Sequence, residues 1–426
     1  MTKRLSAYTV YLILVGASSL FYTVVFTIAS VYRVTTVGLS PLQLVLAGTA
    51  LEAAVFMFEI PTGVVADLYG RRLSIVVGFT IIGIAFIIQG SIPLFVPILL
   101  TEALWGVGYT FTSGAQEAWI ADEIGQARAG MAYLRGAQIG QVGSLAGILI
   151  SVALASVQLQ FPILIGGGLF IALSLFLLLA MTERGFQPAP RAEHSPWQGM
   201  LRTLRSAFAV IRRQPVFVVI LAIGAIYGMS SEALDRLWEA HFLRDLHFPA
   251  LGQLRPVVWF GIINVVERLL GIGAVEVARR RVDPTSHRAV AGFLLAGNAL
   301  LVVSVIGFGL AGHFELALAT YWTVRLARSV NDPLYTTWVN QRIDDAQVRA
   351  TIISTASQTN ALGQILGGPI VGAIGNLWSI NAAIVAAGAI LSPVLILYRL
   401  AIRQGRTGSP HLRRAQTPEA VRPEEG

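Results

Sequence analysis

The sequence predicts an all-α membrane protein in which twelve membrane-spanning helices form two pseudo-symmetric bundles of six. Of the 426 residues, 55% are apolar and only 13% are charged, and the mean hydropathy is +0.68. A soluble domain of ordinary composition carries about twice that share of charge. Apolar runs near the length of one span, about 20 residues, recur along almost the whole chain. Arginines alternate between the two ends of successive runs, as they do in proteins that cross a membrane repeatedly.

Each predicted span is an apolar run bounded by charged or turn-forming residues. The twelve runs cover residues 7–32, 42–66, 73–91, 94–120, 130–156, 160–182, 215–241, 254–277, 288–311, 314–339, 350–374 and 378–400. A cytoplasmic linker at 184–214 separates a first half at 1–183 from a second half at 215–402. The tail at 403–426 is rich in proline and mixed charge, so we expect it to be disordered.

The formal net charge of +8 would suggest nucleic acid as a partner if the protein were soluble. Here nearly all lysines and arginines lie at alternate ends of the predicted spans, and the exceptions are Arg33, Arg244 and Arg255. The positive-inside rule then places both termini in the cytoplasm, which requires an even number of spans. Because membrane orientation accounts for the charge, no nucleic-acid partner is expected.

The linker has a helical pattern of its own. Trp197, Leu201, Leu204 and Phe208 fall at helical spacing, with arginines between them. This pattern is typical of a helix that lies on the inner leaflet of a membrane. It is also common in ordinary linkers that orient the next span, so both interpretations stay open.

Several kinds of chemistry lack the residues they need. The chain has no cysteine, which removes disulfides and thiolate metal sites, and its six histidines are scattered without metal-ligand spacing. No Gly-Lys-Ser/Thr loop occurs, so nucleotide-driven transport within this chain is excluded. The first apolar run exceeds the core of a signal peptide, and no small-residue cleavage site follows it. We therefore expect no removable signal, no cofactor, no metal and no enzymatic activity.

The most informative stretch is Gly63-Val-Val-Ala-Asp-Leu-Tyr-Gly-Arg-Arg72, a charged turn expected between the second and third spans. Gly63 and Gly70 are expected to let the backbone bend and pack closely. The spacing resembles the loop between helices two and three of the major facilitator superfamily, and the chain as a whole is most like the twelve-span drug:proton antiporters of that family. The resemblance implies a charged latch on the cytoplasmic gate. Its expected members are Gly63, Asp67, Gly70, Arg71, Arg72, Asp122 and Arg128.

An internal repeat agrees with that resemblance. Trp119 and Arg128 follow the fourth span, and Trp338 and Arg349 occur in the same way around the end of the tenth; a glycine-rich span follows each pair. Two homologous halves fit a transporter whose halves rock about a site near the middle of the membrane. The second half keeps only a degraded copy of the charged turn, which begins at Glu276 and lacks the glycine.

Ionisable side chains inside the spans are candidate functional groups, because each costs about 2.5–3.5 kcal/mol near a helix centre unless it is paired or hydrated. Helices one, four, seven and ten line the central cavity in the superfamily, so the resemblance implies that charges there face substrate or protons. The candidates for proton coupling are Asp235, Glu102, Glu232, Arg236 and Arg325. Arg236 is expected to reach both Glu232 and Glu239 on its own helix. For Asp235 and Glu102, reversible protonation and a fixed buried ion pair both stay open.

Aromatic side chains on the same four spans are candidates for the cavity wall. With one arginine, the expected cavity residues are Tyr22, Phe26, Trp105, Tyr109, Tyr227, Trp322 and Arg328. Aromatic walls with a few polar groups suit a lipophilic or amphipathic ligand, including a cation held against ring faces. The alternative is that such rings only pack helices or lie in interfacial belts, which we favour for Trp238 and Tyr321. Glu267 and Arg268 are expected to serve packing rather than transport.

The resemblance implies a secondary active transporter that works by alternating access, and specifically a proton-coupled exporter of lipophilic or amphipathic small molecules. The expected partners are a small-molecule substrate, protons and the lipid bilayer, and the expected form is a monomer in a bacterial inner membrane. One alternative is an importer or uniporter of a small metabolite on the same fold. Another is a lipid-translocating or sensor protein. The Gly-Pro pair that drug antiporters carry in span five lies instead at Gly368-Pro369 in span eleven.

Overall fold

The computed structural model describes residues 5–188, 215–249, 255–283, 286–341 and 346–404. All regular secondary structure in these ranges is helical. Most of the expected linker at 184–214, with its amphipathic pattern, and nearly all of the tail at 403–426 lie outside the described residues.

The first half of the chain folds into helices that make six spans. They are α1 (Ala7–Thr35), α2 (Pro41–Tyr69), α3 (Arg71–Ser91), α4 (Phe95–Thr112), α5 (Ala115–Ile124), α6 (Gln126–Val157) and α7 (Phe161–Ala180). Serine begins two of them: Ser6 Oγ accepts a hydrogen bond from the Thr9 amide at 3.2 Å, and Ser40 forms a capping box with Gln43. These caps satisfy amide groups that the first turn of a helix leaves free.

The described helices of the second half repeat this plan. They are α9 (Pro215–Asp245), α10 (Pro256–Arg281), α11 (His287–Gly309), α12 (Phe314–Gln341), α13 (Ala346–Leu377), α14 (Ile380–Leu391) and α15 (Pro393–Gln404). Proline opens α9, α10 and α15, where the missing amide N–H costs no helical hydrogen bond. Ser286 and Ser379 cap α11 and α14.

Two of the predicted spans consist of two helices each. The fourth, predicted at 94–120, is broken between α4 and α5, where Gly114 takes a φ of 71° that glycine adopts without steric cost. The twelfth is broken at Ser392, because Pro393 cannot donate the amide hydrogen bond that would continue α14. Nine described segments are long and apolar enough to cross a membrane by themselves. With α4–α5, α12 and α13 they complete the twelve, and the predicted fold class is confirmed.

The turn between the second and third spans is shorter than predicted. α2 continues through Gly63 to Tyr69 and α3 begins at Arg71, so only Gly70 leaves the helical conformation, with a φ of 116°. A Cβ atom at Gly70 would lie 2.8 Å from a carboxylate oxygen of Glu183, whereas one at Gly63 would meet nothing within 4 Å. The expected bend at Gly63 is wrong, because the residues on both sides of it continue one helix.

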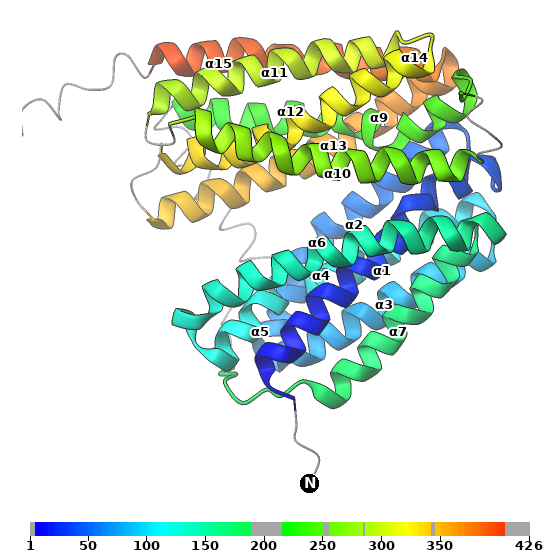
Figure 1. The fold of residues 1–426 in the computed structure, drawn as a ribbon. Coiled ribbons are helices and arrows are strands. Elements are labelled where there is room, and N and C mark those ends of the chain that lie inside the picture. The colour runs from blue at the N-terminus through cyan, green and yellow to red at the C-terminus, as the bar shows by residue number, and fades with distance from the viewer. Residues whose placement is uncertain (1–4, 189–214, 250–254, 284–285, 342–345, 405–426) are drawn as a thin grey trace, which may run out of the picture.

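The two halves lean together like a V (Figure 1). We call the face at which α1 begins and α15 ends the terminal face, and the opposite one the far face. At the far face, Arg244 donates to the Leu39 carbonyl at 2.7 Å and Arg255 donates to the Ser156 carbonyl at 2.6 Å. The apolar core of the second half also extends into α1 and α2 there. The halves are therefore joined at the far face and diverge toward the terminal face.

A glycine seam lies where α13 packs against α2 of the other half. A Cβ atom at Gly368 would lie 2.5 Å from Thr49 Oγ1, and one at Gly372 would lie 3.1 Å from Leu42. Small residues of this kind let two membrane helices approach closely. The seam joins the halves because Thr49 and Leu42 of α2 rest directly against glycines of α13, which have no side chain of their own there.

Candidate substrate cavity and its charge clusters

A cavity of about 1020 Å³ lies between the two halves. Its wall comes from α1 and α6 of the first half and from α10 and α12 of the second. The lining residues are Ser19, Tyr22, Thr23, Phe26, Thr27, Gln141, Ser144, Ile148, Asn264, Glu267, Arg268, Gly271, Ile272, Val275, Glu276, Arg325 and Ser329. The lining of α10 extends to Glu276, near the end of that helix at the terminal face, which is the side toward which the two halves diverge (Figure 1).

The α1 side of the cavity presents an aromatic surface. The Tyr22 and Phe26 rings stack one helical turn apart, with centroids 5.8 Å apart and planes 7° from parallel. Trp105 of α4 meets both rings edge to face, at 6.4 Å and 5.2 Å. Such packing holds aromatic side chains in fixed positions. Tyr22 and Phe26 therefore form the wall, and Trp105 supports it.

The α10 and α12 side of the cavity is charged. Arg325 Nε donates to Glu267 Oε1 at 2.7 Å, and Arg268 Nη1 donates to Gln141 Oε1 of α6 at 3.4 Å. Glu267 was expected from the sequence to serve packing beside Arg268. The structure instead pairs Glu267 with Arg325 on the cavity wall. The available signal was the presence of an acid in the middle of a span, where an unpaired charge is costly.

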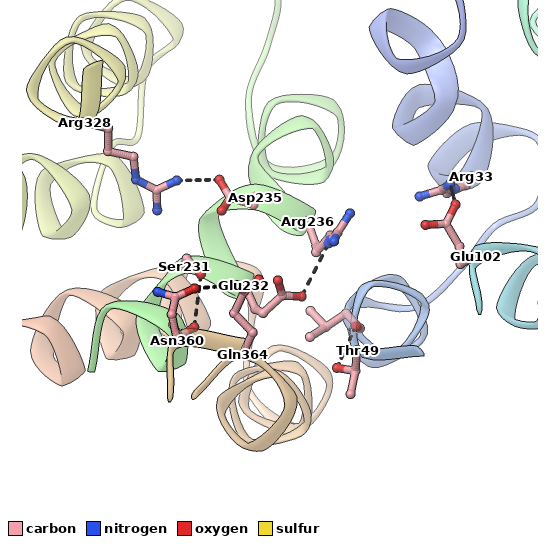
Figure 2. Close-up of polar contacts among 12 residues, drawn as sticks. Arg33, Thr49, Glu102, Ser231, Glu232, Asp235, Arg236, Arg328, Asn360 and Gln364 are labelled. Atoms are coloured by element: carbon pink, nitrogen blue, oxygen red, sulfur yellow. Dashed lines mark hydrogen bonds and ion pairs between the residues drawn. The ribbon is translucent and has the colours of Figure 1, made fainter. Parts of the chain in front are cut away.

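A second ion pair continues this cluster away from the cavity. Arg328 Nη1 lies 2.5 Å from Asp235 Oδ1 (Figure 2). Arg325 Nη1 lies 4.0 Å from the same oxygen. We call Asp235, Glu267, Arg325 and Arg328 the cavity charge cluster. It joins α9, α10 and α12 and contains two acids and two arginines. Asp235 thus lies between two guanidinium groups, in a position where gain of a proton would change its bonding.

Glu232 and Arg236 form a separate pair beneath α2. Arg236 Nε lies 3.4 Å from Glu232 Oε2, and Glu232 is 1% exposed. A side chain at Gly48 of α2 would collide with this pair, so the pair fits into a notch at the interface between the halves. Arg236 was also expected to bind Glu239, but among the described ion pairs it reaches only Glu232. Glu239 Oε2 is buried without a hydrogen-bond partner.

Glu102 lies away from the cavity. Its carboxylate pairs with Arg33 of α1 and accepts a hydrogen bond from Gln89 Nε2 of α3 at 3.1 Å. Figure 2 shows the Arg33–Glu102 pair separated from the Asp235–Arg328 pair. The expectation that Glu102 faces the cavity is therefore wrong for this conformation. Arg33 ends α1 as expected, but its side chain points into the protein and holds the glutamate there.

The lining of the cavity differs from the expected set of helices. Spans five and eight contribute in place of spans four and seven. Trp322 Nε1 donates to the Ile263 carbonyl at 3.3 Å, Tyr109 packs on Trp105, and Tyr227 lines another cavity. Together with Trp105 and Arg328, these residues are outside the wall in this conformation. A contact between any of them and substrate stays a prediction for another conformation.

The charged turn forms a latch at the terminal face. Arg71 bridges two helices, with its Nε 2.8 Å from Asp122 of α5 and its Nη1 3.1 Å from Asp67 of α2. The Arg72 amide donates to Glu183 Oε1 at 2.9 Å, and the Arg72 guanidinium donates to the Leu178 carbonyl. We call Asp67, Arg71, Arg72, Asp122 and Glu183 the terminal-face latch. All of its contacts lie within the first half.

Glu123 extends the latch to the segment after α7. Its carboxylate accepts hydrogen bonds from Thr182 Oγ1 at 2.6 Å, from the Gly185 amide at 2.8 Å and from the Arg184 amide. Burial acts to raise the pKa of this carboxyl, but the hydrogen bonds from Thr182, Gly185 and Arg184 outweigh it and hold the pKa below its ordinary value. Arg128 was expected in the latch, yet its side chain is exposed and joins none of the ion pairs described here.

Two halves of six spans on either side of a central cavity are an architecture found in membrane transporters. The chain belongs to the major facilitator superfamily, because residues 11–273, more than half of its length, match the family described as Major Facilitator Superfamily. It is therefore a multi-pass membrane transporter and not an enzyme.

The relatives are all distant in sequence. An uncharacterized MFS-type transporter of Bacillus subtilis (strain 168), YxaM, is 22% identical over 362 residues, which cover 84% of this chain and 87% of YxaM. Among solved structures, the nucleoside transporter NupG has a TM-score of 0.73 at 14% identity, covering 94% of this chain and 100% of that one. A bacterial homologue of the human lysosomal transporter Spinster, inward-facing and unoccupied, has a TM-score of 0.72 at 15% identity, with 95% and 98% covered. These likenesses establish the fold and leave the substrate open.

Proposed function

We propose that this transporter carries an amphipathic small molecule through the central cavity, by proton-coupled alternating access and in the direction of export. The observation that carries the proposal is the two-sided wall of the cavity. Tyr22 and Phe26 offer ring faces on α1, while Glu267 and Arg325 offer charges opposite them. A ligand with an apolar ring system and a polar or cationic end satisfies both sides at once.

The size of the cavity fits a molecule of this kind. Pockets that bind small molecules commonly enclose about 300–1,000 Å³, and this one reaches about 1020 Å³ in a conformation open at the terminal face. The space suits a ligand with several rings or flexible polar arms. Because the wall is complete within one chain, we propose a monomer as the working unit. We place it in a bacterial inner membrane with both termini in the cytoplasm.

Proton coupling is proposed to act through Asp235. Its carboxylate is held by Arg328 and lies 4.0 Å from Arg325, which also holds Glu267 on the cavity wall. Protonation would remove the negative charge between the two arginines, so that Arg325 could bind a substrate group or Glu267 alone. This links proton binding to the cavity through one shared arginine. The alternative, a permanent ion pair, would leave transport independent of protons.

The test is ethidium efflux from energised cells that lack their own pumps, with and without an uncoupler. For the wild type we expect efflux that stops when the uncoupler is added. Asp235→Asn should lose this efflux, because the variant cannot alternate between charged and neutral forms. Glu315→Gln, an exposed acid in the first turn of α12, is the matched control and should retain at least half of the activity. Uncoupler-sensitive efflux in Asp235→Asn would refute the assigned coupling residue.

A second candidate is an importer of a polar metabolite, and the hydrogen-bonding part of the wall favours it. Thr23, Gln141, Ser144, Asn264 and Ser329 all line the cavity. Structures with the same fold include a nucleoside transporter and a POT family transporter in complex with 5-aminolevulinic acid, which has a TM-score of 0.70. Two results would establish this candidate: thermal stabilisation by nucleosides or small peptides, and an uptake rate that an uncoupler does not change. Stabilisation by lipids alone would favour the lipid-translocating or sensor alternative.

A further inference from the structure

A second cavity lies entirely within the second half of the protein. It has a volume of about 280 Å³ and is lined by residues of α9, α11, α12, α13 and α15. None of its lining residues is shared with the substrate cavity. Its position near the beginnings of α9 and α13 and beside α15 places it toward the terminal face.

Polar atoms without partners gather in this second cavity. Tyr227 Oη, Asn298 Oδ1 and Asn331 Nδ2 are buried and make no hydrogen bond of ordinary geometry, although Tyr227 neighbours Asn331 and Tyr398 neighbours Asn298. Asn298 is 0% exposed and Asn331 is 3% exposed, and both side chains line the cavity. The Asn331 amide oxygen occupies the space that a Cβ atom of Gly297 would fill, so Asn331 fits against α11 at a glycine. These side chains are therefore fixed in position and still have hydrogen-bonding capacity that water in the cavity can use.

Buried polar groups that face a cavity are normally satisfied by water. Each water needs about 30 Å³ and two or more polar partners, so 280 Å³ has room for about nine waters. The open atoms include an acceptor, a donor and a hydroxyl that can act as either. This set can order a connected chain of waters, in which each water both accepts and donates.

The cavity lies between an exposed acid and Tyr227, whose phenol is within electrostatic reach of the cavity charge cluster. Asp332 lines it and is exposed, and the charges of Arg328, Asp332 and Asp235 all act on Tyr227 within it. Arg328 lies one helical turn from Asp332, and its Nε atom is buried without a hydrogen-bond partner. The same arginine holds Asp235. Water in the cavity would therefore extend from solvent at Asp332 to the ion pair proposed to carry the proton.

We propose that this second cavity is a hydrated proton path, separate from the route of the substrate, between the terminal face and Asp235. A hydronium ion in the path gives a proton to the Asp235 carboxylate, leaving a neutral acid and a water. Arg328 keeps its charge and loses its partner, and Asp332, one turn along α12, takes that place. The reverse steps release the proton. The inference rests on the proton coupling proposed above, but the cavity's hydration can be tested without it.

The groups that act on Asp235 come from three elements. Glu52 of α2 and Glu232 of α9 are acids, whereas Arg236 of α9 and Arg325 and Arg328 of α12 are cations. The buried phenol of Tyr321 also lies within electrostatic reach. Asp332 of α12 is a third acid within electrostatic reach of Asp235, so three acids and three cations act on this carboxyl group.

Hydration can be tested directly, because the chain has no cysteine of its own. Ala356→Cys places one thiol on the wall of the second cavity, and Ala383→Cys places one on the fully buried face of α14. A small water-soluble methanethiosulfonate reagent attacks only thiols that water reaches. We expect labelling of the 356 variant to be at least about 10-fold faster. Equal and slow labelling of the two variants would show a dry cavity and overturn the proposal.

The second test separates proton movement from substrate movement in proteoliposomes. Ethidium exchange at equal pH measures the substrate route, and a trapped pH-sensitive dye measures the protons that accompany net ethidium transport. Asn331→Leu should reduce proton movement at least about 10-fold and leave exchange within about 2-fold. Asn298→Leu changes the same cavity from another helix, and the same result in both variants would show that a folding defect in Asn331→Leu is not the cause. Asn264→Leu, on the wall of the substrate cavity, should reduce exchange instead.

Each outcome separates the proposed path from the proposed function. Wild-type proton movement that persists in both Asn331→Leu and Asn298→Leu overturns the path and leaves proton coupling intact. Wild-type protein that moves no protons with ethidium overturns both. Asp332→Asn at the mouth should slow proton movement less than Asn331→Leu does, because water still reaches the opening.

Discussion

The two copies of the charged turn differ in what they hold together. In the first half, Arg71 links α2 to α5, and Glu183 covers the point where Gly70 turns the chain. In the second half, Glu276 binds only Arg279 and Arg280 of its own helix, at 2.8 Å and 2.7 Å, with both arginines 73% exposed. The first copy fixes one helix against another, whereas the described part of the second stabilises a single helix end.

The buried ion pairs also differ between the two halves, but here the second half has the larger set of contacts. The first half buries one compact pair, Arg33 with Glu102, away from the cavity. The second half holds the cavity charge cluster, in which Asp235 and Arg325 each have two partners. Asp235 lies near Arg325 and Arg328, and Arg325 also binds Glu267. From this difference we expect the first half to move as a unit and the ion pairs of the second half to rearrange during transport.

Removal of the buried acid should give the largest effect on stability. Glu102→Ala leaves Arg33 charged and unpaired, and breaking a buried pair in this way costs about 3–5 kcal/mol. Glu276→Ala removes an acid at an exposed helix end and should leave stability nearly unchanged. Thermal unfolding of both variants in the same detergent measures the contrast. If Glu102→Ala matched Glu276→Ala, the first half would not depend on its buried pair.

The turn glycine should come next. Gly70→Ala forces a side chain into a positive φ and against the Glu183 carboxylate, with an expected loss of about 1–3 kcal/mol. Gly63→Ala, within α2 and with no neighbour within 4 Å of an added Cβ atom, should be neutral or stabilising by up to about 1 kcal/mol. The same thermal assay compares them. Equal destabilisation by the two substitutions would contradict the single-residue turn.

The latch should matter for transport more than its counterpart does. Arg71→Gln removes the link from α2 to α5, and we expect ethidium efflux to fall about 10-fold, equivalent to about 1.4 kcal/mol in a rate. Arg279→Gln should change efflux by less than about 2-fold, since its ion pair lies within one exposed helix end. Initial efflux rates, corrected for the amount of protein in the membrane, provide the measurement. A loss in Arg279→Gln as large as in Arg71→Gln would make the two copies equivalent.

The smallest expected effect is a pH dependence at Glu123. Its pKa is lower in the folded protein than in the unfolded chain, so its stabilisation is complete above the ordinary glutamate value of 4.5 and is lost as pH falls through the lower folded value. Glu123→Gln should lower the melting temperature by a few degrees at pH 7, equivalent to about 1 kcal/mol. The difference from wild type should shrink as pH falls below 4.5. A difference that stays constant between pH 7 and pH 3 would exclude the carboxylate as its cause.

Much of the architecture could be predicted because it depends on local sequence. Span length and the placement of arginines gave the twelve spans and two halves, and a motif gave the Arg71 latch with Asp67 and Asp122. The bend at Gly63 was not predicted correctly, since composition alone cannot distinguish a helical glycine from a turning one. The breaks at Gly114 and Pro393 interrupt runs that remain apolar on both sides, so hydropathy did not reveal them.

The site was harder to predict because its pairs join distant spans. Glu267 and Arg325 are 58 residues apart, and no periodicity says that α10 and α12 bring them together. Arg33 lies at the end of its span, as the pattern of arginines indicated, but the direction of its side chain toward Glu102 depends on packing. Tyr22 and Phe26 line the cavity, and their contact with a substrate stays a prediction. Which helices lie opposite them depends on the angle between the two halves, which no local pattern in the sequence specifies.

The glycine seam between α2 and α13 has a mechanical meaning. If side chains of both helices interdigitated, each change of conformation would have to separate them first. At Gly368 and Gly372, α13 has no side chains, so α2 and α13 can change their relative angle without moving side chains of α13 past those of α2. We therefore expect Gly368→Ala to slow the transport cycle and to leave the substrate cavity intact.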